Sequence, residues 1–135
     1  MASRYLLSCL GLFFLSYILS GCGGEPSNNK KKEALQYAEK GLTYAQMGNF
    51  SKAVENTKEA IDIWPNHAEF YHSLGLIYGS AGDYAESNSC YQKALELKPN
   101  YPECYKELAD NHKILGNQGL SDVYYKQYLD LSKKK

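Results

Sequence analysis

The middle of the chain carries apolar residues with the period of an α-helix. Four of them stand at i, i+3, i+4 and i+7, and therefore share one helix face: Tyr71, Leu74, Gly75 and Tyr78. Gly82 predicts the end of this helix, because glycine adopts a left-handed C-terminal conformation without a steric penalty.

A second helix is predicted directly after this turn. Asp83 is expected to cap its first turn, with Glu86 three residues later completing a capping box. The apolar side of the helix consists of Tyr91, Ala94, Leu95 and Leu97. Pro99 is expected to stop it, because proline has no N–H group and clashes with the preceding turn. Asn100 and Glu103 then offer a capping pair for a following helix.

The same helix–turn–helix pattern recurs at intervals of 34 residues. The residues that recur in register are aromatic residues, turn glycines and small residues: Tyr37, Tyr71 and Tyr105; Gly48, Gly82 and Gly116; Gly41, Gly75 and Ala109; Ala53, Ser87 and Ser121. Self-similarity at a fixed period of this length indicates a helical repeat array. The alternative is an ordinary helical bundle with a chance periodicity. Small residues in register with the turns favour closely packed helix pairs, since a larger side chain would separate the helix axes.

These residues resemble the tetratricopeptide repeat, whose pattern contains an aromatic residue, Leu, a small residue, Tyr, a Gly turn, Ala and Pro. The resemblance extends from about Ala34 to Lys133. It implies an all-α, right-handed α-solenoid of about three helix–turn–helix repeats. We expect these repeats at 34–67, 68–101 and 102–135, the last ending in a basic tail. The sequence departs from the family pattern at Lys40, Thr57, His112, Tyr128 and Lys133.

The small residues predict where the helices approach one another. Gly75 and Ser87 are expected at the closest crossing within the middle repeat. Ala94 is expected where the next repeat docks.

The chain begins with a pattern typical of an export signal. A short positively charged start is followed by an apolar run from Leu6 to Leu19 and then by small residues. The run is too short for a comfortable membrane span. Leu19-Ser20-Gly21-Cys22 is similar to the lipobox of bacterial lipoproteins, which implies that residues 1–21 are removed and that Cys22 is acylated. The alternative is ordinary signal cleavage that leaves Cys22 as a free thiol.

The lipobox resemblance implies a location in the bacterial cell envelope. The protein would be lipid-anchored in the bilayer through Cys22, and Gly23 after the cysteine resembles the sorting signal of an outer-membrane lipoprotein. Residues 22–33 are expected to form the lipidated cysteine and a flexible linker, because they are rich in Gly, Pro, Ser, Asn and Lys. A linker of this kind reaches roughly 18 Å. Its lysines, Lys30 to Lys32, are either a solvated charge run or a contact with anionic lipid.

Composition and chemistry exclude several function classes. The 15 basic and 15 acidic residues balance, so no basic face for nucleic acid is predicted. His67, His72 and His112 form no metal-ligand pattern, and no phosphate loop or nucleophile motif occurs. The sequence therefore predicts a protein that is not an enzyme and that needs no cofactor or metal. Cys90 and Cys104 are expected to be free, buried or half-buried thiols, with a disulfide as the alternative.

The family resemblance implies a concave groove lined by the first helix of each repeat. Carried over residue by residue, the groove positions are Leu35, Ala38, Leu42, Ala45 and Gln46; Glu69, His72, Leu76, Gly79 and Ser80; and Glu103, Lys106, Asp110, Lys113 and Ile114. The groove is thus expected to change from apolar to charged along its length. The family's clamp for a terminal carboxylate is not reproduced, because Ala38, Leu42 and Glu103 stand where its polar groups would be needed.

The C-terminal edge is the second candidate surface. Tyr128 replaces the small residue found at Ala60 and Ala94, and no further helix follows it in the sequence. Tyr124, Tyr128 and Leu131 either cap the core with hydroxyls in water or form an interface for self-association or for a partner helix.

We therefore interpret the chain as a membrane-anchored adaptor that binds another envelope protein or a peptide segment of one. Two alternatives remain open at the level of sequence. One is a pilotin-like assembly factor for a secretin or pilus component. The other is an enzyme or an accessory regulator of cell-wall hydrolases.

Overall fold

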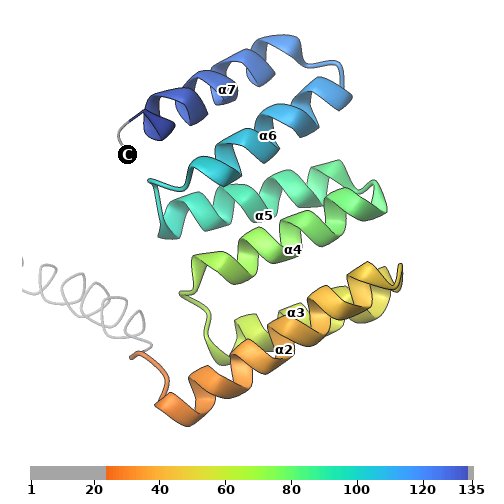
Figure 1. The fold of residues 1–135 in the computed structure, drawn as a ribbon, viewed down its shortest axis with the longest axis vertical. Helices are drawn as coiled ribbons and strands as arrows, with labels where there is room; N and C mark the ends of the chain where they lie inside the picture. Colours follow the sequence, from red (N-terminus) through yellow and green to blue (C-terminus); the bar gives the residue numbers. More distant parts are fainter. Residues whose placement is uncertain (1–23, 134–135) are drawn as a thin grey trace, which may run out of the picture.

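The computed structural model describes residues 24–133, and this part of the chain consists of six helices with no strand. In chain order (Figure 1) the helices are α2 (Asn28–Gln46), α3 (Phe50–Ile63), α4 (Ala68–Ala81), α5 (Tyr84–Leu97), α6 (Pro102–Ile114) and α7 (Gln118–Ser132). The all-α fold predicted from the periodicity is confirmed.

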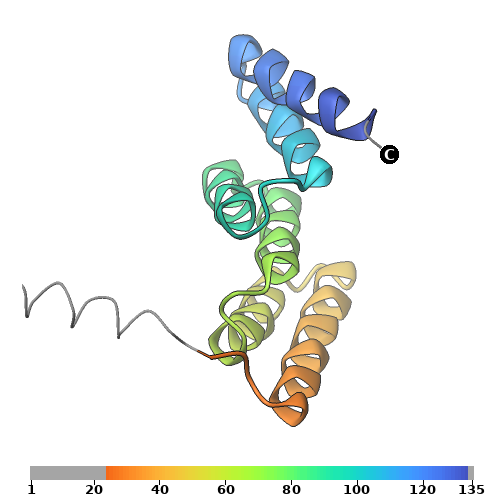
Figure 2. The ribbon, with the colours of Figure 1, turned by 90° about the vertical axis from the view of Figure 1, so that its left-hand side faces the viewer.

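The helices pair as three hairpins that stack along the long axis of the molecule. The pairs α2 with α3, α4 with α5 and α6 with α7 make the most extensive contacts, and Figure 2 shows the hairpins following one another from α2 to the C-terminal α7. Gly82 has φ of 89°, which confirms the left-handed residue expected after α4. Gly48 and Gly116 occupy the corresponding turns.

The helix starts differ from the predicted caps. Asp83 does precede α5, but its side chain makes no cap hydrogen bond, so the expected capping box is absent from this helix. The expected Asn100 cap is wrong, because α6 begins at Pro102 and Tyr101 takes the cap position. Proline is well suited to the first helical position, since its fixed φ matches the helix and it has no N–H to leave unpaired.

The linker predicted at 22–33 is wrong for its second half, because α2 begins at Asn28. The Lys31 backbone N–H donates to the Ser27 carbonyl oxygen at 2.9 Å and continues the helix ladder. The Lys31 side chain forms an ion pair with Glu25 and lies 4.9 Å from the centre of the Trp64 ring. These contacts order residues that lack an apolar period. Residues 22 and 23 lie outside the described part of the chain.

The closest crossing of α4 and α5 is at Gly75 and Ser87, as the small residues predicted. The Ser87 hydroxyl donates to the Gly75 carbonyl oxygen at 2.8 Å. A Cβ atom built on Gly75 would lie 2.5 Å from Cε1 of Tyr91, a ring that is only 1% exposed. Ala94 is fully buried in the core cluster that also contains Cys104 and Leu108 of α6. Both features confirm the predicted packing of this repeat.

A buried polar network joins the second hairpin to the third. The Asn111 side-chain amide donates to the Ser87 hydroxyl at 2.9 Å and to Oδ1 of Asn88 at 2.8 Å. Asn111 is only 6% exposed, so water has little access to its side chain. The two hydrogen bonds satisfy both N–H donors of its amide group. The Gly75 carbonyl, the Ser87 hydroxyl and the Asn111 amide thus form one chain of bonds from α4 to α6.

Cys90 and Cys104 are free thiols, as expected. Cys90 is half-buried and Cys104 is buried. Burial raises the pKa of Cys90 to about 11 and that of Cys104 to about 12, so both remain protonated at neutral pH.

His72 is half-buried beside two tyrosine rings of the core. Its ring centre lies 5.7 Å from that of Tyr91 and 5.1 Å from that of Tyr101. Its Nε2 atom is buried and has no hydrogen-bond partner among the described residues. Burial lowers the pKa of His72, although Glu103 and Glu69 act in the opposite direction. The neutral ring is therefore the form that the fold accommodates.

Gly75→Ala should destabilise the protein, because the new methyl group would collide with the Tyr91 ring. We expect a loss of about 1–3 kcal/mol in the free energy of unfolding, measured by urea denaturation. Gly119→Ala is the matched control, since a Cβ atom at Gly119 meets nothing within 4 Å. It should be neutral or stabilise the first turn of α7 by up to about 1 kcal/mol. Equal losses for the two variants would contradict the crossing.

Stability should fall as the pH is lowered from 7.5 to 5.5, and His72 should cause part of this fall. Its pKa in the folded protein lies below the ordinary histidine value of about 6.5, so the unfolded chain binds more protons in this window and the free energy of unfolding decreases as the pH falls. His72→Phe should flatten the change when urea midpoints are compared at the two pH values. An unchanged slope in the variant would show that His72 does not titrate on unfolding.

Candidate binding groove

An apolar depression lies between α2 and α4, which are the first helices of the first and second hairpins. It has a volume of about 260 Å³ and is lined by Leu42, Ala45 and Gln46 from α2 and by Leu76, Ile77 and Ser80 from α4. Leu42 remains 40% exposed at its rim, whereas Ile77 is 1% exposed and forms its floor. Leu76 is half-buried. The depression therefore offers accessible apolar surface with an amide and a hydroxyl at its edge.

Most of these lining residues were predicted as groove positions from the family resemblance. The structure brings Leu42, Ala45 and Gln46 together with Leu76 and Ser80, as expected. Ile77 was missed, because the pattern assigns its position to the core rather than to the groove. A buried residue can still be the floor of a depression, and the apolar run from Leu74 to Tyr78 is the signal that could have indicated it.

Other predicted groove residues lie elsewhere. Ala38 is 8% exposed, packs in a core cluster with Ala34, Ala60 and Phe70, and does not line the depression between α2 and α4. Leu35, one turn earlier, is 50% exposed but does not line the depression. His72 packs between two tyrosine rings, as described above. The close approach of α5 limits the size of the residue at position 79, because a Cβ atom added to Gly79 would lie 3.3 Å from the Ser87 hydroxyl oxygen.

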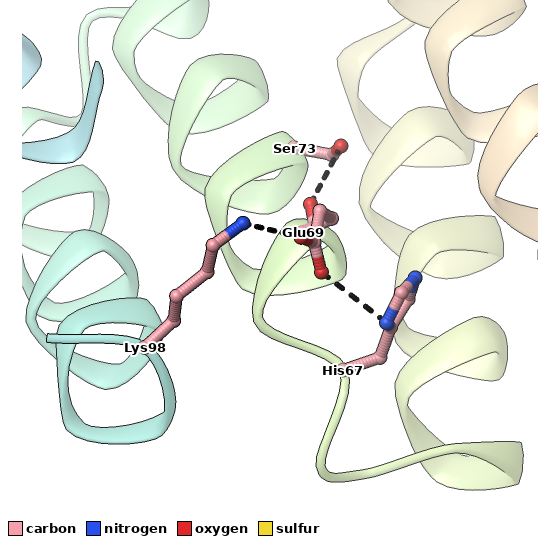
Figure 3. Close-up of polar contacts among 4 residues, drawn as sticks. All are labelled: His67, Glu69, Ser73 and Lys98. Carbon is pink, nitrogen blue, oxygen red and sulfur yellow. Dashed lines mark hydrogen bonds and ion pairs between the residues drawn. The ribbon is translucent and has the colours of Figure 1, made fainter. Parts of the chain in front are cut away.

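Glu69 is held by a polar cluster that Figure 3 shows in close-up. One carboxylate oxygen lies 2.9 Å from Nζ of Lys98 and the other lies 3.2 Å from Nδ1 of His67. The Ser73 hydroxyl donates to the backbone oxygen of Glu69 at 2.9 Å. A ligand that used this carboxylate would first have to compete with Lys98 and His67.

The pKa values in this cluster follow from burial and hydrogen bonding. Burial acts to raise the pKa of Glu69, but the hydrogen bond from Lys98 and the charges nearby outweigh it, and the net pKa is lowered. Burial also lowers the pKa of His67, against the attraction of Glu69. At neutral pH the lasting ion pair is therefore between Glu69 and Lys98, and His67 contributes as a neutral ring stacked on Trp64.

The α6 portion of the predicted groove is charged. Lys106 and Asp110 form an ion pair of 2.8 Å one helical turn apart, and the hydrogen bond to Asp110 raises the pKa of Lys106. Glu103 and Lys113 are exposed, and neither forms an ion pair within residues 24–133. The predicted change from apolar to charged character along the array matches the side chains present. Whether these residues bind a ligand stays a prediction.

The described part of the chain offers little for other kinds of site. Between residues 24 and 133, no three His, Cys, Asp or Glu side chains are grouped closely enough to hold a metal ion. In the same range, no helix is both long and apolar enough to cross a bilayer.

At the C-terminal edge, the predicted residues are half-buried rather than free. Tyr124 lies almost parallel to the His112 ring, with ring centres 5.5 Å apart, and Tyr128 and Leu131 are also half-buried. The more exposed apolar side chains of α7 are Val123, which is 56% exposed, Leu120 and Tyr125, which are each 48% exposed, and Leu129, which is 37% exposed. The exposed apolar residues of α7 therefore differ from those expected and lie on more than one side of the helix.

Solved structures with the same fold come from several kinds of protein. The crystal structure of MamA superposes with a TM-score of 0.72 at 24% identity, over 75% of this chain and 59% of that one. The second repeat domain of Spaghetti (RPAP3), solved with the HSP90 peptide SRMEEVD, gives a TM-score of 0.70 at 17% identity, over 76% of this chain and 95% of that one. The N-terminal domain of stress-induced protein-1 from C. elegans gives 0.72 at 19% identity, over 80% and 95%.

These likenesses show the fold alone, and the chain spans about three fifths of the MamA structure that it matches. A sequence search of curated proteins found no match. The family profile described as "Tetratricopeptide repeat" matches residues 32–100, about half of the chain. With three helical hairpins in a 34-residue register and this match, the chain belongs to the tetratricopeptide repeat family, whose repeats mediate protein–protein interaction.

Proposed function

We propose that this protein is a membrane-tethered adaptor whose groove between α2 and α4 binds an apolar segment of another bacterial envelope protein. The observation that carries the proposal is the depression of about 260 Å³ in which Leu42 and Leu76 remain accessible to a ligand. Exposed apolar surface inside a concave, partly polar rim is typical of recognition sites.

The chemistry of the groove favours a short helical or extended peptide with one or two apolar anchors. Leu42 and Leu76 supply walls from two neighbouring helices, and Ile77 closes the floor. Gln46 at the rim provides an amide that can pair with a peptide backbone. The Ser80 hydroxyl already donates to the Leu76 carbonyl at 2.8 Å, so its remaining capacity is as an acceptor.

The tether is the second half of the proposal. It rests on the lipobox-like residues Leu19 to Cys22, which resemble the site of signal removal and cysteine acylation in bacterial lipoproteins. The acylated Cys22 would hold the adaptor on a bilayer, with the outer membrane as the expected address. Two or more acyl chains anchor a protein stably where one does not.

The groove is tested by photo-crosslinking in the native host, with a photoreactive residue in place of Gln46 in the full chain. We expect discrete adducts that are reduced about tenfold or more by Leu42→Glu, since the carboxylate would be desolvated against Leu76 and Ile77. Leu120→Glu is the matched control, because Leu120 is 48% exposed on α7, and α7 lies at the opposite end of the array from α2 (Figure 1). Adducts that persist unchanged in Leu42→Glu would contradict a role for this depression.

The anchor is tested by Cys22→Ala. The mature wild-type protein should begin at Cys22, carry the mass of its acyl chains and enter the detergent phase on partitioning. The variant should lose both properties, because the thiol that accepts the lipid is absent. A wild-type protein without acyl mass, together with a variant that still partitions with membranes, would contradict the lipoprotein assignment and leave the groove experiment unaffected.

A further inference from the structure

The last helix exposes residues that are covered at the same positions inside the array. Four residues stand at i, i+3, i+7 and i+11 and so share one side, which we name the free face: Asp122, Tyr125 and Leu129 of α7, and Lys133, the residue that follows its last turn. One oxygen of the Asp122 carboxylate accepts a hydrogen bond from Gln118 at 2.7 Å, which leaves the other oxygen for a further partner. Tyr125 is 48% exposed and Leu129 37% exposed. Tyr91, which precedes Tyr125 by one repeat, is only 1% exposed.

The contacts of α5 show what covers this side of a helix within the array. Tyr91 packs in the core cluster with Cys104 and Leu108 of α6. Asn88, which corresponds to Asp122, accepts a hydrogen bond from Asn111 of α6 at 2.8 Å. The free face of α7 is therefore built like a surface that packs against another helix, and within residues 24–133 no helix follows it.

The opposite end of a second copy does not fit this face. The helices that pack onto a preceding repeat use apolar side chains, such as Leu74 of α4 and Leu108 of α6, which are 5% and 0% exposed. The corresponding residue of α2 is Lys40, which is exposed. Head-to-tail stacking would bury the Lys40 ammonium against Tyr125 and Leu129, and burial of an unpaired charge is costly. Open-ended filaments are disfavoured for the same reason.

The same helix of a second copy does fit. When two α7 helices lie antiparallel with their midpoints near residue 127, Tyr125 of each copy faces Leu129 of the other. Asp122 then faces Lys133 of the second copy at both ends of the contact, which pairs opposite charges twice. In a parallel arrangement each of these charges would face its own equivalent, and like charges repel. The charge pattern of the free face thus selects the antiparallel, two-fold arrangement.

We infer that the protein forms a two-fold symmetric dimer through the free face of α7. Each copy contributes Tyr125 and Leu129 to a small apolar centre, flanked by ion pairs between Asp122 and Lys133. The dimer leaves the groove between α2 and α4 open on both copies, because that depression is lined by other helices. The inference does not depend on the identity of the groove ligand.

Sedimentation equilibrium of the full chain, in a detergent whose density the solvent matches, tests the dimer. The wild type should dimerise reversibly with concentration. Leu129→Lys should raise the dimer dissociation constant by about a hundredfold, since a change worth about tenfold occurs at each of two symmetric positions. Leu120→Lys is the matched control, because Leu120 is also exposed but lies half a helical turn away from Leu129 around α7, and it should leave the constant unchanged.

A charge reversal tests the antiparallel register. Asp122→Lys should weaken the dimer, and the combination of Asp122→Lys with Lys133→Asp should restore it to within about threefold of the wild type. A wild type that stays monomeric at the highest concentration reached would overturn the inference. So would a dimer that resists Leu129→Lys, as expected of two chains that merely share a micelle, or a double variant that remains as weak as Asp122→Lys.

Discussion

The contact between Gly75 and the Tyr91 ring is the constraint on which the array depends. The missing side chain at Gly75 allows α5 to approach closely enough for the Ser87 hydroxyl to reach the Gly75 carbonyl. The same hydroxyl accepts from Asn111 and so ties the next hairpin to this crossing. The direction of α4, which carries Leu76 into the groove, therefore follows from an approach that any larger residue would prevent.

The first and last helices of the described array differ in the side that faces away from it. At the start, Lys40 stands where the inner repeats have Leu74 and Leu108, and this polar substitution makes α2 a solvated end. At the other end, α7 keeps the apolar residues of an inner helix, with Tyr125 and Leu129 in place of Tyr91 and Leu95. Repeat arrays need polar capping elements for solubility, and within residues 24–133 the α2 side has such a polar residue at Lys40, whereas the α7 side exposes Tyr125 and Leu129.

The 34-residue register predicted the hairpins, their glycine turns and the crossing at Gly75, because each depends on residue size and backbone freedom, which a sequence displays directly. The Asn111 network was not predicted, since its bonds join residues 23 and 24 positions apart and depend on how two hairpins dock. The start of α2 at Asn28 was missed for a similar reason. Lys31 is ordered by contacts with Glu25 and with the Trp64 ring, and the local pattern of apolar residues predicts neither contact. In the groove, family positions indicated Leu42 and Leu76 but misplaced Ala38, whose small side chain lies within the core.

The early start of α2 changes the geometry of a membrane anchor. With Glu25 held by Lys31, only the short segment from Cys22 to Glu25 would separate the proposed acylated cysteine from the folded array, a reach of about 10 Å instead of the roughly 18 Å of a free linker. A short tether restricts the volume that the groove can sample. It therefore raises the effective concentration of the groove for any partner in the same bilayer. The same tether would exclude partners whose binding segment lies farther from the membrane than the groove can reach. Membrane proximity would then act as a filter for partner choice, set by the residue at which α2 begins.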